Sequence, residues 1–351
     1  MKVFFLYTEM AGYFASSIKH LASVTDTIYI IRWPVNKEAP FIFSFPNNVK
    51  VFERSDYNTN SIIDLVNSVN PDIIISSGWM DKSYLKVCKQ FKGKIPVVMG
   101  MDNQWRGTLK QHIMSLIAPL TLHKCYSHTW VPGAPQKKYA LKLGFNKENV
   151  FEGYYSADTK LFEKSAYDRI NSEKYPRKFI YIGRYVKVKG LDLLFKAFCE
   201  LCNENSYEWE LICAGTGEMF DKKPIHPKIK HLGFVQPNQL KDVIKEAGVF
   251  ILPSKFEPWG VVVHEMATAG FPMIVSDETG AVSSFLKNSK NGYTFKNSDY
   301  KSLKYAMKKM MLKSDKELKN MAKISHQLGT NHSPKKWSQL LFKIVESFKQ
   351  N

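Results

Sequence analysis

"VFILPSKFEPWGVVVHEMATAGFPMIVSD", residues 249–277, contains two short apolar runs with a helix-length segment between them. The runs "VFILPS" and "FPMIVSD" are strand-sized and rich in branched residues, which is typical of strands buried on both faces. Pro258 suits a first helical turn, and Gly260 lets the backbone come close to a ligand. The stretch therefore predicts a strand, a helix and a second strand of one parallel sheet.

The same alternation extends in both directions along the 351 residues. We predict an α/β protein with two Rossmann-like domains that face each other across a cleft, where ligands bind at the carboxyl ends of the strands. The strand-like runs of the first half are "KVFFLY", "TIYIIRW", "VKVFE", "PDIIISS", "IPVVMGM" and "HTWVPG", and those of the second half are "KFIYIGR", "WELICAG", "IKHLGF", "VFILPS" and "FPMIVSD".

The domain prediction follows from where this alternation pauses. Residues 154–178 are polar, charged and poor in periodicity, so we interpret them as an interdomain linker. We predict an N-terminal domain over 1–165 and a C-terminal domain over 166–330. Residues 331–351 have the pattern of an amphipathic helix that could dock on either domain, including by packing back on the N-terminal domain.

Composition narrows the classes of protein. The chain is 44% hydrophobic, and no apolar run reaches the length of a membrane span, so we expect a globular protein of the cytoplasm. Its five cysteines are irregularly spaced, which argues against a disulfide framework. The net charge is +18, and residues 301–351 hold 12 Lys and Arg residues against 3 Asp and Glu. This excess favours an anionic membrane, a nucleic acid or a phosphorylated substrate, or is simply a solvated helical face.

A phosphate site is predicted where "KFIYIGR" ends. Gly183 closes the strand, Arg184 and Lys189 follow as cations, and Gly190 opens the next helix. Helix N-termini attract phosphate, and the cations add to that field. The chain has no Walker loop, and "AGTGEMF" lacks the third glycine of a dinucleotide fingerprint, so ATP and NAD are disfavoured.

Two carboxylates stand eight residues apart, at Glu257 in a loop and Glu265 in the following helix. Carboxylates accept paired hydrogen bonds from diols, so this pair could hold two sugar rings of one ligand. A solvated loop residue and a helix-surface residue are the alternative, although the segment around Glu265 is too apolar for an exposed face. A zinc motif is excluded because Thr268 stands where H-E-x-x-H needs its second histidine.

Over residues 178–295 the chain resembles the retaining, nucleotide-sugar-dependent glycosyltransferases of family 4, which have the GT-B fold. The resemblance rests on "YIGRYVKVKGLDLLFKAF", "LICAGTGE", "HLGFVQPNQL", "FILPSKFEPWGVVVHEMATAGFPMIVSDETG" and "NGYTF". It implies that Glu257 lies near the donor sugar and Glu265 near the ribose, and that Arg184 and Lys189 neutralise the diphosphate. The donor-binding positions that it implies are Gly183, Gly215, Thr216, Phe234, Val235, Pro258, Trp259, Gly260, Val261 and Glu265.

The amino half matches the family less closely. "EMAGYFASS" stands where the family often has a tighter Gly-Gly loop, so only Gly12 carries over. Members often have a histidine where this chain has "GMDNQWRG". Its polar and aromatic residues directly follow a strand and suit a sugar acceptor, whereas the alternative is an Asp-Asn helix cap. These acceptor candidates are Asp102, Asn103, Trp105 and Arg106.

The resemblance implies a metal-independent transferase that moves a hexose or N-acetylhexosamine from a nucleotide sugar to a glycan acceptor of a surface polysaccharide. No D-x-D motif is present, and we expect neither a cofactor nor a metal. The alternatives are a sugar-nucleotide epimerase, a glycan synthase, or a non-catalytic protein that binds nucleotide sugars or nucleic acid. No nucleic-acid motif occurs, so we expect no nucleic-acid partner.

A last segment, "HIMSLIAPLTLHK" with Lys110, combines apolar residues with cations. It suits a surface that meets a membrane or a lipid-linked acceptor at the inner face of the cell membrane. The same pattern also fits a helix buried in the core.

Overall fold

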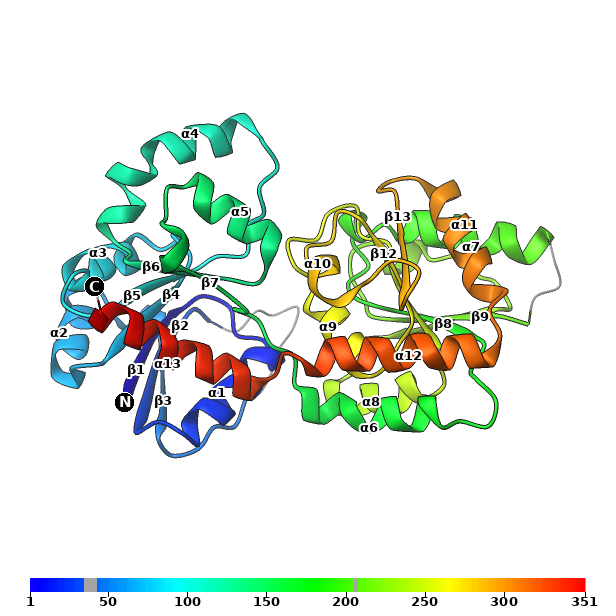
Figure 1. Ribbon diagram of the computed structural model, residues 1–351, viewed down its shortest axis with the longest axis horizontal. Helices are drawn as coiled ribbons and strands as arrows, with labels where there is room; N and C mark the ends of the chain where they lie inside the picture. The colour runs from blue at the N-terminus through cyan, green and yellow to red at the C-terminus, as the bar shows by residue number, and fades with distance from the viewer. Residues whose placement is uncertain (35–42, 205–207, 351) are drawn as a thin grey trace. The chain divides into compact units, whose positions relative to one another are not determined.

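The computed structural model describes residues 1–34, 43–204 and 208–350, and the chain divides into two units (Figure 1). The first unit comprises Met1–Asp158 together with His332–Asn351, and the second comprises Thr159–Asn331. Each unit is built on its own parallel sheet. The boundary predicted at residue 165 lies seven residues too far along, inside a helix of the second unit.

In the described part of the first unit, seven strands form one parallel sheet in the order β3-β2-β1-β4-β5-β6-β7. Helices follow most of the strands, as a doubly wound sheet requires. The strands are β1 (Lys2–Tyr7), β2 (Thr27–Arg32), β3 (Val49–Glu53), β4 (Ile73–Ser77), β5 (Val97–Gly100), β6 (His128–Val131) and β7 (Val150–Glu152). The helices are α1 (Gly12–Ala22), α2 (Thr59–Val69), α3 (Lys82–Phe91), α4 (Leu109–Ile117), α5 (Ala134–Lys142) and α13 (Pro334–Gln350).

Strand β1 shows why the sheet is apolar on both faces. Its side chains alternate between two core clusters, with Val3 and Phe5 in one and Phe4 and Leu6 in the other. Successive side chains of a strand point to opposite faces, so a strand between two helical layers must be apolar throughout. This is the pattern from which the sequence predicted parallel strands.

Helix α13 covers one of these faces. The Trp337 ring stacks on Trp130 at 4.8 Å between ring centroids, and its indole nitrogen donates to the carbonyl of Tyr154 at 2.6 Å. Leu341 and Ile344 are fully buried in the same cluster. The last helix of the chain is therefore part of the core of the first unit.

In the described part of the second unit, six strands form a parallel sheet in the order β10-β9-β8-β11-β12-β13. The strands are β8 (Lys178–Ile182), β9 (Glu210–Ala214), β10 (Ile229–Gly233), β11 (Val249–Leu252), β12 (Met273–Ser276) and β13 (Gly292–Phe295). The helices are α6 (Thr159–Ile170), α7 (Leu191–Glu204), α8 (Pro237–Lys245), α9 (Val261–Thr268), α10 (Val282–Phe285), α11 (Tyr300–Met311) and α12 (Asp315–Thr330). The prediction of an α/β protein with two Rossmann-like domains is confirmed.

The linker predicted over residues 154–178 contains the boundary between the units, but α6 occupies most of its middle, so the prediction of an unstructured segment is wrong. Phe162 and Ala166 of this helix are buried, and so is Arg169. The Arg169 guanidinium donates to the backbone carbonyls of Ile244 and Ala247 at the end of α8 and of Ala269 after α9. The polar composition of this segment did not reveal a packed helix. Its Arg169 side chain is buried, and backbone carbonyls accept its hydrogen bonds inside the protein.

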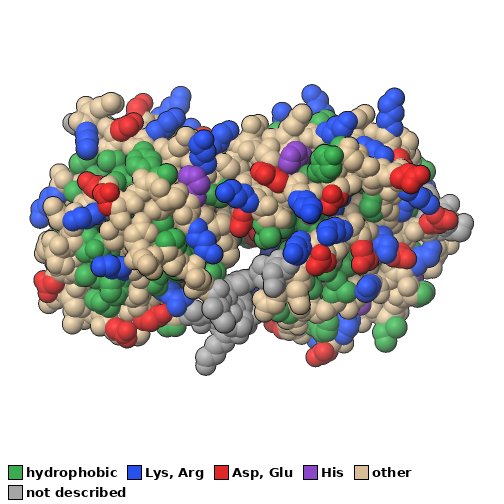
Figure 2. Space-filling view, turned by 90° about the horizontal axis from the view of Figure 1, so that it is seen from below, with side chains coloured by type: hydrophobic (Ala, Val, Ile, Leu, Met, Phe, Trp, Pro, Cys, Tyr) green, Lys and Arg blue, Asp and Glu red, His purple; other side chains and the backbone are tan. Residues whose placement is uncertain are grey.

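No helix of the described residues is both long and apolar enough to cross a membrane. The cysteines are all free thiols. On the face that Figure 2 shows, Lys and Arg side chains are spread over both units, and Asp and Glu side chains lie among them.

Candidate functional site

The candidate donor site lies where the strands of the second sheet end. Gly183 follows β8 and Gly215 follows β9, and these two residues approach each other closely. A Cβ on Gly215 would lie 1.9 Å from the carbonyl oxygen of Gly183, and its φ of +138° also favours glycine. The two predicted glycines thus let adjacent strand ends meet without side chains between them.

The loop that carries Lys189 is fixed to the loop after β11. The amide of Lys255 donates to the carbonyl of Val188 at 2.7 Å. Gly190 has a φ of +67°, and a Cβ there would lie 2.1 Å from the carbonyl oxygen of Pro253. Any other residue at position 190 would push the two loops apart. The backbone therefore sets the position of Lys189 relative to the loop of Glu257.

Lys189 and Glu257 form an ion pair between Nζ and Oε2. Their side chains are 16% and 15% exposed, so the pair is mostly shielded yet still reaches solvent. Such a pair holds both side chains in place more firmly than a fully exposed one does. The cation predicted for the diphosphate and the carboxylate predicted for the sugar are thus direct neighbours, although 68 residues separate them in the chain.

The backbone of Glu257 is itself held on both sides. Its amide donates to the carbonyl of Glu278 at 3.2 Å, and its carbonyl accepts from the amide of Gly280 at 3.1 Å. Gly260 follows with a φ of +89° as the residue before α9 and supplies no side-chain cap. The amide of Val263 donates to the carbonyl of Gly260 at 3.0 Å, so the amides of Val261 and Val262 are the ones that can serve a ligand or water.

The other predicted donor residues differ in exposure. Arg184 and Thr216 are exposed, the Phe234 side chain is 46% exposed, and Val235 is half-buried. Trp259 is buried and packs edge-on against Phe285, so only its backbone can serve a ligand. Pro258 and Glu265 are half-buried, Glu265 one turn into α9.

Tyr181 is a site residue that the sequence reasoning missed. It is buried at the end of β8, and its hydroxyl donates to the carbonyl of Arg184 at 2.7 Å. Burial raises its pKa well above the ordinary value, the charge of Glu257 raises the pKa further, and the charge of Arg184 lowers it. Tyr181 therefore lies close to both charged side chains and fixes the backbone of one of them. A lone aromatic in a strand carries no signal for such a role.

The candidate acceptor residue Asp102 comes directly after β5 in the first unit. Its carboxylate accepts a hydrogen bond from the Tyr155 hydroxyl at 3.2 Å, and the Tyr155 ring contacts Tyr13 edge-on. Burial raises the pKa values of Tyr7, Tyr13 and Tyr155, and the negative charge of Asp102 raises all three further. Asp102 thus sits in a tyrosine cluster that the sequence did not predict, because three separate segments contribute to it.

The helix cap considered as an alternative for Asp102 is excluded. Helix α4 begins at Leu109, and Thr108 caps it in a capping box with Gln111. Trp105 packs against Tyr139 and His112, so its ring supports the fold.

The remaining acceptor candidates are exposed. Asn103 and Arg106 lie at the surface after β5. Gly12 begins α1, and a Cβ there would meet nothing within 4 Å. Local packing therefore does not explain the glycine at this position.

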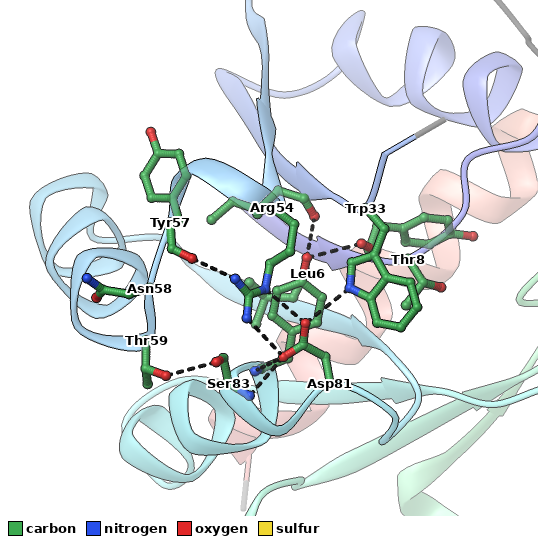
Figure 3. Close-up of polar contacts among 12 residues, drawn as sticks. Leu6, Thr8, Trp33, Arg54, Tyr57, Asn58, Thr59, Asp81 and Ser83 are labelled. Carbon is green, nitrogen blue, oxygen red and sulfur yellow. Dashed lines mark hydrogen bonds and ion pairs between the residues drawn. The ribbon is translucent and has the colours of Figure 1, made fainter. Parts of the chain in front are cut away.

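A second polar cluster of the first unit, also missed from sequence, joins residues that follow strands (Figure 3). Asp81 accepts from Arg54 at 2.9 Å and from the Trp33 indole nitrogen at 3.1 Å, and it caps α3. Burial alone would raise the Asp81 pKa, but the hydrogen bonds from Arg54 and Trp33 lower it below its ordinary value. These contacts tie the ends of β2, β3 and β4 together.

Comparison with known proteins identifies the second unit. Residues 164–327 match the family model described as "Glycosyl transferases group 1". Most of the second unit is therefore similar to this family. The matched residues include Gly183, Lys189, Glu257 and Glu265. They do not include Asp102, which lies in the first unit.

The curated relatives of this chain are distant. An uncharacterized glycosyltransferase of Methanocaldococcus jannaschii is 31% identical over 123 residues, which is 33% of this chain and 31% of that protein. The capsular polysaccharide biosynthesis glycosyltransferase CapM of Staphylococcus aureus is 25% identical over 58% of this chain and 53% of that protein. The chain spans about a quarter to a third of the length of the first three curated relatives that it matches.

Solved structures extend the likeness to the whole fold. HepE of Anabaena in complex with UDP matches with a TM-score of 0.76 at 14% identity, over 99% of this chain and 100% of that chain. Sucrose-phosphate synthase of Thermosynechococcus elongatus matches with a TM-score of 0.75 at 13% identity over the full length of both. The chain therefore has the two-unit GT-B fold of these glycosyltransferases.

Proposed function

We propose that the chain is a retaining glycosyltransferase that moves a hexose or N-acetylhexosamine from a nucleotide sugar to a glycan acceptor. The observation that carries the proposal is the Lys189–Glu257 ion pair at the glycine-lined strand ends of a group 1 glycosyltransferase unit. A cation and a carboxylate side by side suit a ligand that carries a phosphate next to a sugar hydroxyl.

Each charged residue has a role in this reaction. The bond between the anomeric carbon and the diphosphate oxygen breaks, and Lys189 and Arg184 stabilise the charge that develops on the leaving phosphate. Glu257 accepts hydrogen bonds from donor-sugar hydroxyls, while Glu265 accepts from the ribose. The acceptor hydroxyl oxygen bonds to the anomeric carbon on the face that the phosphate leaves, and the hydroxyl proton passes to the departing diphosphate oxygen.

We propose that these cations and the open amides of α9 neutralise the diphosphate without a metal ion. Activity in a chelator tests this part: turnover should change by less than about twofold in EDTA, because no step would need a metal. A requirement for added Mg²⁺ or Mn²⁺ would contradict it and leave the transfer reaction itself intact.

Surface polysaccharide synthesis is the proposed context. CapM is named for capsular polysaccharide biosynthesis, and WaaG, which matches with a TM-score of 0.66 at 12% identity, is named for lipopolysaccharide biosynthesis. Asp102 and its tyrosines are the proposed acceptor contacts, since a carboxylate among aromatic rings suits sugar hydroxyls. The acceptor would be a glycan or a lipid-linked glycan at the cytoplasmic face of the cell membrane.

A donor screen followed by product analysis tests the function. Thermal shifts with UDP-, GDP-, CMP- and dTDP-sugars identify the donor, and UDP-sugars come first because HepE has been solved with UDP-glucose. NMR of the product should then show the anomeric configuration of the donor. An inverted product would refute retention. Interconversion of the donor sugar without an acceptor would indicate an epimerase, and no binding of any donor would refute the proposal.

A further inference from the structure

Helix α4 carries an apolar stripe that faces solvent. Leu109, Ile113 and Leu116 stand at i, i+4 and i+7, and Leu120 continues the stripe into the short 3-10 turn Ala118–Leu120. Residues at this spacing lie on one side of a helix. Leu109, Leu116 and Leu120 are 78%, 80% and 69% exposed, and Ile113 is exposed by about half. We call these four residues the α4 stripe.

The alternative of a buried core helix is wrong, because α4 contains no buried residue. Its attachment is on the other side, where Met114 packs against the core of the first unit. Trp105, just before the helix, packs against Tyr139 of α5, and Thr108 caps the first turn. The helix is thus anchored on one side while its most apolar side is exposed to solvent. The helix itself lies at an edge of the first unit in Figure 1.

The chain around the α4 stripe has only one sign of charge. Residues 103–147 contain seven Lys and Arg residues and no Asp or Glu. Arg106, Lys110 and Lys124, next to or within the helix, are all exposed. An exposed apolar stripe with flanking cations is the pattern by which helices lie in the surface of an anionic bilayer.

We propose that the α4 stripe docks this protein on an anionic lipid bilayer. The four apolar side chains enter the boundary between headgroups and acyl chains, and the flanking cations contact lipid phosphates. A second copy of the chain fits the stripe less well, since a twofold interface would bring the same acid-free segments together and their charges would repel. The proposal rests on the proposed transferase function only in that it specifies where the enzyme contacts a membrane. Membrane binding can be tested without a sugar donor.

Binding to vesicles tests the docking. The full chain is mixed with vesicles of phosphatidylcholine alone or of equal parts phosphatidylcholine and phosphatidylglycerol, and bound protein is measured by flotation at low and high salt. We expect binding only to the anionic vesicles, weakened by salt. Replacing Leu109, Leu116 and Leu120 together by Ser should weaken binding by at least about tenfold, because their apolar burial is lost.

The matched control replaces three exposed apolar residues of the second unit by Ser, namely Ile225, Tyr305 and Leu312, which are 103%, 65% and 67% exposed. This variant should bind as the unchanged chain does. Equal binding by the α4 variant, or binding that ignores lipid charge, would overturn the proposal. The proposal would also be overturned if the unchanged chain formed a concentration-dependent dimer but did not bind vesicles, and if the α4 variant abolished that dimer. Binding of the nucleotide-sugar donor is measured on the same variants. A failure of membrane docking is then distinguished from a failure of the proposed transferase function, because only the latter abolishes donor binding.

Discussion

At the scale of single residues, the position of Lys189 leads to the sharpest prediction. Replacing it by Ala removes a preorganised cation from the leaving phosphate, which should lower kcat by at least about a hundredfold. Lys187 is the matched control, since it is an exposed lysine in the same 3-10 turn, Lys187–Lys189. Its replacement by Ala should change kcat by less than about threefold. Steady-state kinetics with the identified donor measures both, and circular dichroism checks the fold. A loss under threefold for Lys189→Ala would remove the assignment.

A second prediction at this scale concerns His128, which is buried in β6 beside Phe348 of α13. Burial lowers its pKa to about 4, from an ordinary value of about 6.5. The unfolded chain therefore binds a proton more readily than the folded one. The stability that this histidine contributes is present above about pH 6.5 and is lost as pH falls towards 4, by about 3 kcal/mol at most.

Urea unfolding between those pH values measures the effect. His128→Gln should flatten the fall in stability, while the exposed His112→Gln should leave it unchanged. Part of the slope should persist in His128→Gln, because burial also lowers the pKa of His332 to about 4. An unchanged slope in His128→Gln would show that this histidine does not control acid stability.

At the scale of elements, helix α6 depends on one buried guanidinium. Arg169 donates to carbonyls at the ends of two other helices, α8 and α9, and replacing it by Ala would remove these three buried hydrogen bonds. We expect a loss of at least about 2 kcal/mol in unfolding free energy, since each buried carbonyl left unsatisfied costs about 1 to 3 kcal/mol and the Ile244 carbonyl keeps the amide of Ala247 as a donor. Tyr167 on the same helix is 70% exposed, so Tyr167→Ala is the control and should cost little. Denaturant titration of both variants tests this, and equal stabilities would contradict it.

The elements also show what the sequence could predict. Strands buried on both faces, such as β1 and β11, are visible as continuous apolar runs, and their order with helices predicted both sheets. Strands β7 and β13 were not assigned, because β7 has only three residues and β13, with the sequence GYTF, is not a continuous apolar run. In α4 the periodicity predicted an apolar side but not whether that side faces the core, since periodicity does not say what covers a helix.

The candidate site was predictable in its motifs and not in its contacts. The glycines and charges after β8 and β11 follow from strand ends meeting at one sheet edge. The direct pairing of Lys189 with Glu257 does not follow, because it depends on how closely Gly190 allows two loops to approach. The tyrosines around Asp102 come from β1, α1 and the segment after β7, and no local pattern links them.

At the scale of the whole molecule, the chain leaves the first unit at residue 158 and returns to it at residue 332. The core of the first unit is therefore completed by the last helix, where Trp337 stacks on Trp130 and Phe5. Trp337→Ala would leave a large cavity there and should lower the stability of the first unit by about 3 to 5 kcal/mol. The second unit has its own sheet and core, so its stability should change by less than about 0.5 kcal/mol.

Hydrogen exchange read out by mass spectrometry resolves the two units in one experiment. In Trp337→Ala, amides of β1, α1 and β6 should exchange faster, while those of β11 and α9 should keep their protection, because the lost contacts lie in the first unit alone. Glu346→Ala, an exposed change on the same helix, should affect neither unit. Faster exchange in both units would mean that they unfold as one cooperative body. Donor binding in Trp337→Ala would then be lost as well, whereas separate units predict that it survives.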